Sequence, residues 1–264
     1  MLSEKQIQDV AQKILCEIAG LGEKEDTVGG FPHEDILSRM QKKTTARIGV
    51  GKTGPRLRTS TYLKLRADHA KAKDAVMTDV NPEILKRLGL FVVQTKCLDK
   101  NMYLTRPDLG KDFDEKTRKY IVDNCKQNAN VQLIISDGLS SSAVEANAEK
   151  ILPAVEEGLK EKGISLGTPI FIKYGRVAAQ DVISELLHPD IVCSFIGERP
   201  GLATASSMSA YLSYHAKTGM PEARRTVVSN IHKNGISAVE AGAYIADLLE
   251  IMLTKKTSGI DLKK

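Results

Sequence analysis

Between residues 89 and 255, short β-type runs alternate with helical stretches, and this alternation limits the possible folds more than any other feature of the chain. The β-type runs, rich in Val, Ile and Phe, are residues 91–95, 131–136, 169–174 and 190–196. The helical stretches lie near residues 113–127, 142–162, 178–187, 205–214 and 238–254. Strands that alternate with helices indicate a parallel sheet covered by helices on both faces. We therefore expect an α/β fold with a Rossmann-like domain over residues 89–264.

The segment before this domain, residues 34–88, is predicted to be a small helical region with a strong positive charge. Three stretches have helical patterns, and the Gly- and Pro-containing residues 49–55 interrupt them. Residues 42–74 hold ten Lys and Arg side chains but only two acidic ones, a net charge of +8 in a chain whose total is +5. A patch this basic is expected to meet an anionic ligand or an acidic partner protein.

The first twenty residues are predicted to form a separate amphipathic helix. Its apolar side chains fall on one helical stripe, formed by Ile7, Val10, Ala11, Ile14, Leu15 and Ile18. Ser3 and Gln6 match a capping box, and Gly20 is a typical helix end. Residues 21–33 are polar and glycine-rich, which is the composition of a linker. Two alternatives stay open: the helix packs back onto the body, or it docks on another molecule while tethered.

Several functional classes are disfavoured by what the sequence lacks. No apolar run approaches the ~18 residues of a membrane-spanning helix, and residues 3–9 are too polar for a signal peptide. The four cysteines and five histidines are scattered, without C-x-x-C or H-x-x-x-H spacing, so we expect no disulfide framework and no metal site. Tyr62 is the only aromatic residue in the basic segment, which argues against nucleic-acid binding by base stacking.

One glycine motif is similar to a nucleotide-binding loop. Residues 49–54, GVGKTG, fit the pattern G-x-G-x-x-G. A dinucleotide-binding loop follows a buried strand and opens a helix at its third glycine. Here the preceding residues offer one strong apolar side chain, and Pro55 and Arg56 follow the third glycine. We therefore predict a basic turn between helices.

Three loops that follow predicted strands carry the best candidates for a binding site. Residues 137–145, 175–177 and 197–202 contain glycines, hydroxyl side chains and arginines. In an α/β sheet, ligands bind at the carboxyl ends of the strands, where helix N-termini present free N–H groups. We expect these loops to line one cleft for a large ligand with amide or phosphate groups. The sequence shows no recognisable nucleophile elbow, Cys/His signature or acidic two-metal cluster, so we expect no catalytic residues in this chain.

Six segments of the chain together resemble one known family. They are ARIGVGKTGPRLRTSTYLKLRADHAKAKDAV (46–76), VVQTK with YLTRPDLG (92–110), SDGLSSSAVEAN (136–147), GTPIFIKYGRV (167–177), VCSFIGERPGLATASSMSAYLSY (192–214), and VVSNIHKNG with AVEAGAYI (227–245). In this order they cover most of residues 44–260, and they are similar to the small (light) subunit of ethanolamine ammonia-lyase.

This resemblance implies one half of an adenosylcobalamin-dependent lyase that converts ethanolamine to acetaldehyde and ammonia. The large subunit of that family is a barrel with the substrate site and the catalytic side chains, and the small subunit helps to enclose the cobalamin at the boundary. Carried over by matching motifs, the family's cobalamin contacts fall on Val177, Glu198 and Val227. Some relatives have cysteine where this chain has Val227, so only a backbone or apolar contact is expected there. Glu198 would accept hydrogen bonds from corrin amides or, alternatively, form a salt bridge to Arg199 or Arg176.

The resemblance also implies a cytoplasmic enzyme inside a bacterial microcompartment, with residues 1–20 as the candidate contact to shell proteins. Two functions of other classes remain as alternatives. A nucleotide-binding Rossmann-type oxidoreductase would use the sheet edge for NAD, and a nucleic-acid-binding module would use the basic segment. We expect a large subunit as the partner, and neither nucleic acid nor membrane.

Overall fold

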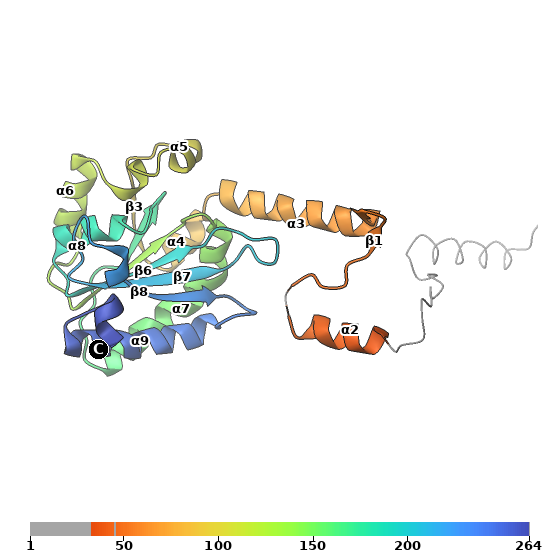
Figure 1. Ribbon diagram of the computed structural model, residues 1–264. Coiled ribbons are helices and arrows are strands. Elements are labelled where there is room, and N and C mark those ends of the chain that lie inside the picture. The colour runs from red at the N-terminus through yellow and green to blue at the C-terminus, as the bar shows by residue number, and fades with distance from the viewer. Residues whose placement is uncertain (1–32, 45, 264) are drawn as a thin grey trace, which may run out of the picture. The chain divides into compact units, whose positions relative to one another are not determined.

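The computed structural model describes residues 33–44 and 46–263, and Figure 1 shows their helices and strands. The chain divides into two compact units, Met1–Gly51 and Lys52–Lys264. Helix α2 (His33–Lys42) belongs to the first unit, and the other described elements belong to the second. The amphipathic helix predicted at residues 1–20, and the predicted linker except for its last residue, lie outside the described residues.

A six-stranded sheet forms the centre of the second unit (Figure 1). In spatial order its strands are β3 (Phe91–Gln94), β5 (Ile170–Lys173), β4 (Val131–Ser136), β6 (Ile191–Gly197), β7 (Met208–Tyr214) and β8 (Thr226–Ile231). The first four are parallel, whereas β7 and β8 are added antiparallel. The α/β class with a mostly parallel sheet is therefore confirmed, and each of the four predicted strands is found to within one residue at either end.

Helices cover both faces of this sheet, as the alternation predicts. They are α7 (Ser141–Glu161) and α9 (Ala238–Lys255) on one face, and α6 (Glu115–Asn124) and α8 (Ala179–Leu187) on the other. Leu133 and Phe195 are part of the core with α7 and α9, whereas Ile134 and Val192 are part of the core with α6 and α8. Neighbouring residues enter opposite cores because side chains alternate along a strand.

The segment 205–214, which the sequence pattern predicts as a helix, is instead mainly strand β7. Met208, Ala210 and Leu212 are buried in the core with α7 and α9, and Ser213 is buried on the opposite face. The segment alternates these apolar residues with Ser and Tyr, as a strand would, but Met, Ala and Leu favour helices locally, so the two signals conflict. Pairing with β6 along the whole strand overrides that preference. Strand β8 is a second element that the pattern did not predict.

The remaining elements lie in the basic segment and in the connections. They are the two-residue strands β1 (Lys52–Thr53) and β2 (Arg56–Leu57), the helices α3 (Thr59–Met77), α4 (Pro82–Arg87) and α5 (Lys100–Thr105), and the 3-10 turns Leu109–Lys111, Glu222–Arg224 and Gly259–Lys263. The helical character predicted for residues 34–88 is confirmed apart from the small β1–β2 hairpin. Within the described ranges, no helix is both long and apolar enough to cross a membrane.

Helix α3 leaves most of its surface open. Of its 19 residues only Ala75 is buried, and Tyr62 and Leu63 are 51% and 61% exposed. The helix is attached near its C-terminal end, where the Ser141 hydroxyl donates to the Ala75 carbonyl over 3.3 Å. Because most helix stability in proteins comes from packing of an apolar face, α3 gains little stability from contacts with the other described residues.

Candidate functional site

Three loops meet at the carboxyl ends of β4, β5 and β6 and enclose a hollow of about 220 Å³, which we call the cleft. Gly138 follows β4, Val177 follows β5 and Glu198 follows β6. The complete lining is Tyr103, Gly138, Leu139, Gly175, Arg176, Val177, Ile196, Gly197, Glu198, Arg199 and Tyr211. The structure thus brings the three loops singled out by the sequence to one edge of the sheet, where α/β proteins bind ligands.

Glycines bring two of these loops into backbone contact. Gly138 has a φ of +54°, which favours glycine, and a Cβ there would overlap the Gly197 carbonyl oxygen. A Cβ on Gly197 would overlap the carbonyl oxygens of Asp137 and Ser140. The Leu139 N–H donates to the Gly197 carbonyl over 3.0 Å. The loops after β4 and β6 therefore form one fixed floor.

Glu198 is half-buried at the end of β6. Its Oε1 accepts a hydrogen bond from the Ser209 hydroxyl and, over 3.4 Å, from the Asn230 N–H. Its Oε2 has no hydrogen-bond partner among the residues that the structure describes. Within the described ranges, no salt bridge joins Glu198 to Arg176 or Arg199, although both arginines line the cleft. A carboxylate with a free acceptor therefore remains in the lining.

Arg176 and Val177 follow the turn that ends β5. The Arg176 N–H donates to the Gly110 carbonyl over 2.8 Å, and its Nη2 donates to the Tyr103 carbonyl over 2.7 Å. Its guanidinium also lies over the Tyr103 ring, 4.2 Å from the centroid. The Nε atom is buried and has no partner among the described residues, so a hydrogen-bond donor is left over beside the cleft. Val177 adds half-buried apolar surface.

Val227 lies beside the cleft and does not line it. It is 45% exposed on β8 and pairs in register with Tyr211 of β7. Tyr211 does line the cleft, and register partners point to the same face of a sheet. The structure therefore places Val177 and Glu198 in one hollow and Val227 one strand further along the same surface.

Two aromatic residues of the lining were not singled out by the sequence. Tyr103 comes from α5, and Tyr211 comes from the strand that the pattern predicts as a helix. No local signal marks them, because their positions depend on contacts between distant segments. Burial, with Glu198 adding to its effect, raises the pKa of Tyr211, so its hydroxyl is a donor in the cleft at neutral pH.

The glycine motif at residues 49–54 does not form a nucleotide-binding loop. It leads into the β1–β2 hairpin, where Gly54 takes a φ of +60°. Among the described residues no strand precedes the motif, and no helix opens at its third glycine. The prediction of a basic turn is confirmed.

Cysteine and metal-ligand chemistry offer no second site in the described ranges. No three His, Cys, Asp or Glu side chains within residues 33–44 and 46–263 are grouped to hold a metal ion. Cys97, Cys125 and Cys193 are free and buried. Burial raises the pKa of Cys125 to about 11, so this thiol is protonated at neutral pH.

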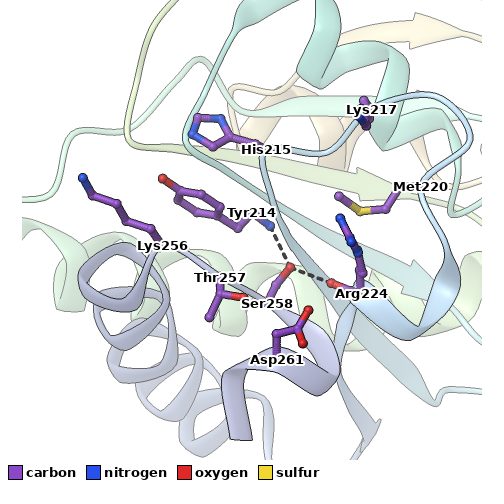
Figure 2. A pocket seen from close by; sticks show the side chains of 9 residues that line it. All are labelled: Tyr214, His215, Lys217, Met220, Arg224, Lys256, Thr257, Ser258 and Asp261. Atoms are coloured by element: carbon purple, nitrogen blue, oxygen red, sulfur yellow. Dashed lines mark hydrogen bonds between the residues drawn. The ribbon is translucent and has the colours of Figure 1, made fainter. Parts of the chain in front are cut away.

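A second hollow, of about 360 Å³, lies at the opposite edge of the sheet (Figure 2). It adjoins Tyr214 at the end of β7, which pairs with Ile191 at the start of β6. Ser258 accepts from the Tyr214 N–H over 3.1 Å and donates to the Arg224 carbonyl. The other lining residues are His215, Lys217, Met220, Lys256, Thr257 and Asp261. None of the predicted site residues lies here, and this edge holds the amino ends of the parallel strands, away from the usual ligand edge.

Comparison with known proteins shows which sequences this chain is similar to. Residues 34–263 match the family described as ethanolamine ammonia-lyase light chain (EutC). The ethanolamine ammonia-lyase small subunit of Clostridium perfringens is 48% identical over 263 residues, which is 99% of this chain and 89% of that protein. The small subunit of Clostridium tetani is 57% identical over 225 residues, 85% of this chain and 76% of that protein. The small subunit of Listeria monocytogenes is 42% identical over 294 aligned positions, 99% of this chain and 100% of that protein.

Proposed function

The chain belongs to the ethanolamine ammonia-lyase light-chain family, and from this premise we propose that it helps to bind adenosylcobalamin in an enzyme that converts ethanolamine to acetaldehyde and ammonia. The cleft would hold one part of the cofactor, at the boundary with a large subunit. One observation supports this proposal most. Val177 and Glu198, which the family resemblance indicates, are distant in sequence and line one hollow at the ligand edge of an α/β sheet.

The residues of the cleft fit the rim of a corrinoid. A corrin ring carries amide side chains and methyl groups, so it needs both hydrogen-bonding and apolar contacts. Glu198 offers a free acceptor, Arg176 a buried donor without a partner among the described residues, and Val177 apolar surface. The cleft, at about 220 Å³, is smaller than the roughly 300–1,000 Å³ of pockets that enclose a drug-sized ligand. This chain would therefore cover part of the cofactor, and another subunit would cover the rest.

The proposed role of this chain is to bind and orient, while the large subunit carries the catalytic side chains. The cofactor, when bound, supplies the radical chemistry of the reaction. Glu198 would accept a hydrogen bond from an amide N–H, and Val177 would pack against the apolar part of the rim. The ionisable side chains of the described lining are one glutamate, two arginines and two tyrosines, without a nucleophile and base in contact.

The exposed basic segment is the proposed surface for the large subunit. A hollow of about 440 Å³ lies beside the hairpin and the start of α3, and its lining includes Arg56, Leu57 and Tyr62. Arginine and tyrosine beside apolar surface are typical of the residues that anchor interfaces. The charge of +8 over residues 42–74 would favour an acidic partner surface and speed the encounter.

Co-expression with the large subunit of a relative tests this function. The two chains are expected to purify together and to show a corrinoid absorption spectrum after addition of adenosylcobalamin. This chain alone is expected to form no acetaldehyde. Replacing both Arg56 and Arg58 by Glu is expected to reduce co-purification and to remove much of the salt dependence of the association rate.

The matched control for that experiment reverses two exposed lysines of α6, Lys116 and Lys119, which changes the net charge by the same amount. Normal assembly of the double arginine variant at physiological ionic strength would contradict the proposed interface. Acetaldehyde formation by the isolated chain would contradict the proposed division of roles.

A separate proposal concerns the N-terminal part of the chain. The sequence divides the chain into residues 1–20, 21–33, 34–88 and 89–264, and in this division residues 1–20 form a unit of their own. We propose that this N-terminal helix docks on microcompartment shell proteins. Its deletion is expected to leave complex assembly and specific activity intact and to abolish co-sedimentation with shells. A truncated chain that melts several degrees lower and still enters shells would indicate that the helix packs on the body.

A further inference from the structure

Tyr174, which links β5 to the cleft residues 175–177, has a strained backbone. Its φ is +58°, in the left-handed region that bulky residues rarely adopt. Such a conformation persists only where the surrounding structure holds it, and residues of this kind gather at ligand sites. The contacts of Tyr174 therefore indicate what fixes the loop that follows it.

Hydrogen bonds from three sides and one aromatic contact hold Tyr174. Its N–H donates to Oδ1 of Asp137 over 2.8 Å, and its carbonyl accepts from the Thr95 hydroxyl over 3.0 Å. Its phenol donates to Oδ1 of Asp79 over 3.3 Å. Its ring stacks on Tyr103, with the centroids 6.0 Å apart. The bond to Asp137 is the one that fixes the N–H of the strained residue itself.

Asp137 is in turn held by Lys100 of α5. The Lys100 Nζ lies 3.6 Å from Oδ2 of Asp137, and the two side chains are 8% and 1% exposed. Neither atom has a hydrogen-bond partner among the described residues. Burial raises the pKa of Asp137 to about 6, and Lys100 opposes that rise. A buried lysine and carboxylate with so few partners are unfavourable for folding alone, which points to a role at the adjacent site.

An aromatic pair connects Lys100 to the cleft. The Lys100 Nζ lies 5.4 Å from the ring centroid of Tyr103 and 5.3 Å from that of Tyr174. The Tyr103 hydroxyl donates to the Gly175 carbonyl over 3.2 Å, and the Tyr103 ring carries the guanidinium of Arg176. Because Gly175 and Arg176 follow Tyr174 directly, the backbone of Tyr174 sets the direction of the loop.

We propose that Lys100 is a positioning residue of the cleft. Its ammonium holds the Asp137 carboxylate in place, Asp137 holds Tyr174 in the left-handed conformation, and Tyr174 directs residues 175–177 into the cleft. Lys100 is not part of the cleft lining, so it would act without touching the cofactor. The link to cofactor affinity rests on the proposed function, whereas the link to loop geometry does not.

Hydrogen exchange in the cofactor-free, full-length chain tests the loop. In Lys100→Met, the amides of Tyr174 and Arg176 are expected to exchange faster relative to amides in α9, because the chain of contacts that holds them is broken. Arg225→Met is the matched control, since it removes the cation of a second buried ion pair, Arg225–Asp181. That control is expected to raise exchange without preference for the cleft loop. Lys100→Gln replaces Lys100→Met if the latter does not fold.

Cofactor affinity in the assembled complex tests the consequence. Lys100→Met is expected to raise the Kd for adenosylcobalamin roughly tenfold, a loss of about 1.4 kcal/mol of binding free energy. The folded Arg225→Met complex is expected to keep the wild-type Kd. In the double variant Lys100→Met with Asp137→Asn, the amide oxygen of the substituted side chain still accepts from the Tyr174 N–H, and no buried charge needs compensation. Most of the lost affinity is therefore expected to return, a strong departure from additivity.

The possible results separate this proposal from the proposed function. Unchanged exchange at Tyr174 and Arg176 in the lysine variant overturns the proposal, and so does an equal loss of affinity in the single and double variants. Faster local exchange with a wild-type Kd supports the positioning role and instead rejects the cleft as the cofactor site.

Discussion

Replacing Arg225 by methionine is expected to lower the free energy of unfolding of the full-length chain by about 3–5 kcal/mol, the usual effect of removing one partner from a buried ion pair. The Arg225 side chain is 1% exposed, directly before β8. Its Nη1 and Nη2 donate to the two carboxylate oxygens of Asp181 in α8 over 2.8 Å and 2.9 Å. Burial raises the pKa of Asp181, and the guanidinium opposes that rise. Without Arg225, a buried carboxylate would have to take up a proton or reach water.

Urea unfolding followed by circular dichroism measures this effect. Arg224→Met is the matched control, because Arg224 carries the same charge one position earlier and is exposed, and its effect is expected within about 0.5 kcal/mol. The double variant Arg225→Met with Asp181→Leu removes both charges, and it is expected to regain much of the lost stability. Unfolding of Arg225→Met at the wild-type urea concentration would show that this ion pair does not stabilise the fold.

The parallel half of the sheet could be predicted because its strands carry their own signal. Strand β4 is buried at every position, and four of its six residues are apolar, three of them β-branched. Ser140 caps α7, where its hydroxyl accepts from the Ala143 N–H over 3.1 Å, so a helix start is also marked locally. Where strand and helix alternate with such signals, the order of the elements is enough to indicate the α/β class.

The antiparallel half was not predicted, because its local signals are weak or conflict with one another. Strand β7 alternates apolar residues with Ser and Tyr but contains helix-favouring Met, Ala and Leu, and its pairing with β6 on one side and β8 on the other favours the strand. The Arg225–Asp181 pair joins residues 44 positions apart, and in the sequence Arg225 looks like a second surface arginine beside Arg224. Such contacts become visible only once the sheet has been assembled.

The candidate site could also be predicted only in part. The loops after β4, β5 and β6 could be predicted to meet, since parallel strands place their carboxyl ends at one edge. Lys100 and Tyr103 could not, because the short helix α5 reaches the cleft through contacts with Asp137, Gly175 and Arg176 across the fold. Local sequence patterns therefore identify the loops that form the cleft, and long-range contacts determine how those loops are held.

Replacing Glu198 by alanine is expected to weaken adenosylcobalamin binding to the assembled complex by about 1–3 kcal/mol, the range for a buried polar group that loses its partner. The structure gives the physical reason. Ser209 and Asn230 occupy Oε1, whereas Oε2 has no partner among the described residues and no described arginine pairs with the carboxylate. A carboxylate in this state favours a ligand with N–H donors, and the amides of the corrin rim are such donors.

Two further variants serve as comparisons for Glu198→Ala. Glu198→Gln keeps an acceptor oxygen and removes the charge, so it is expected to raise the Kd less than Glu198→Ala does. Glu157→Ala removes an exposed carboxylate from α7 and is expected to leave the Kd unchanged. Titration of each complex with the cofactor, followed by corrinoid absorption, measures the three constants. If Glu198→Ala binds as tightly as wild type, Glu198 serves only to hold Ser209 and the Asn230 backbone, and the cofactor contact lies elsewhere. An equal loss of affinity in the alanine and glutamine variants would contradict the expected order. It would show that cofactor binding requires the negative charge of Glu198 and that an acceptor oxygen alone is not sufficient.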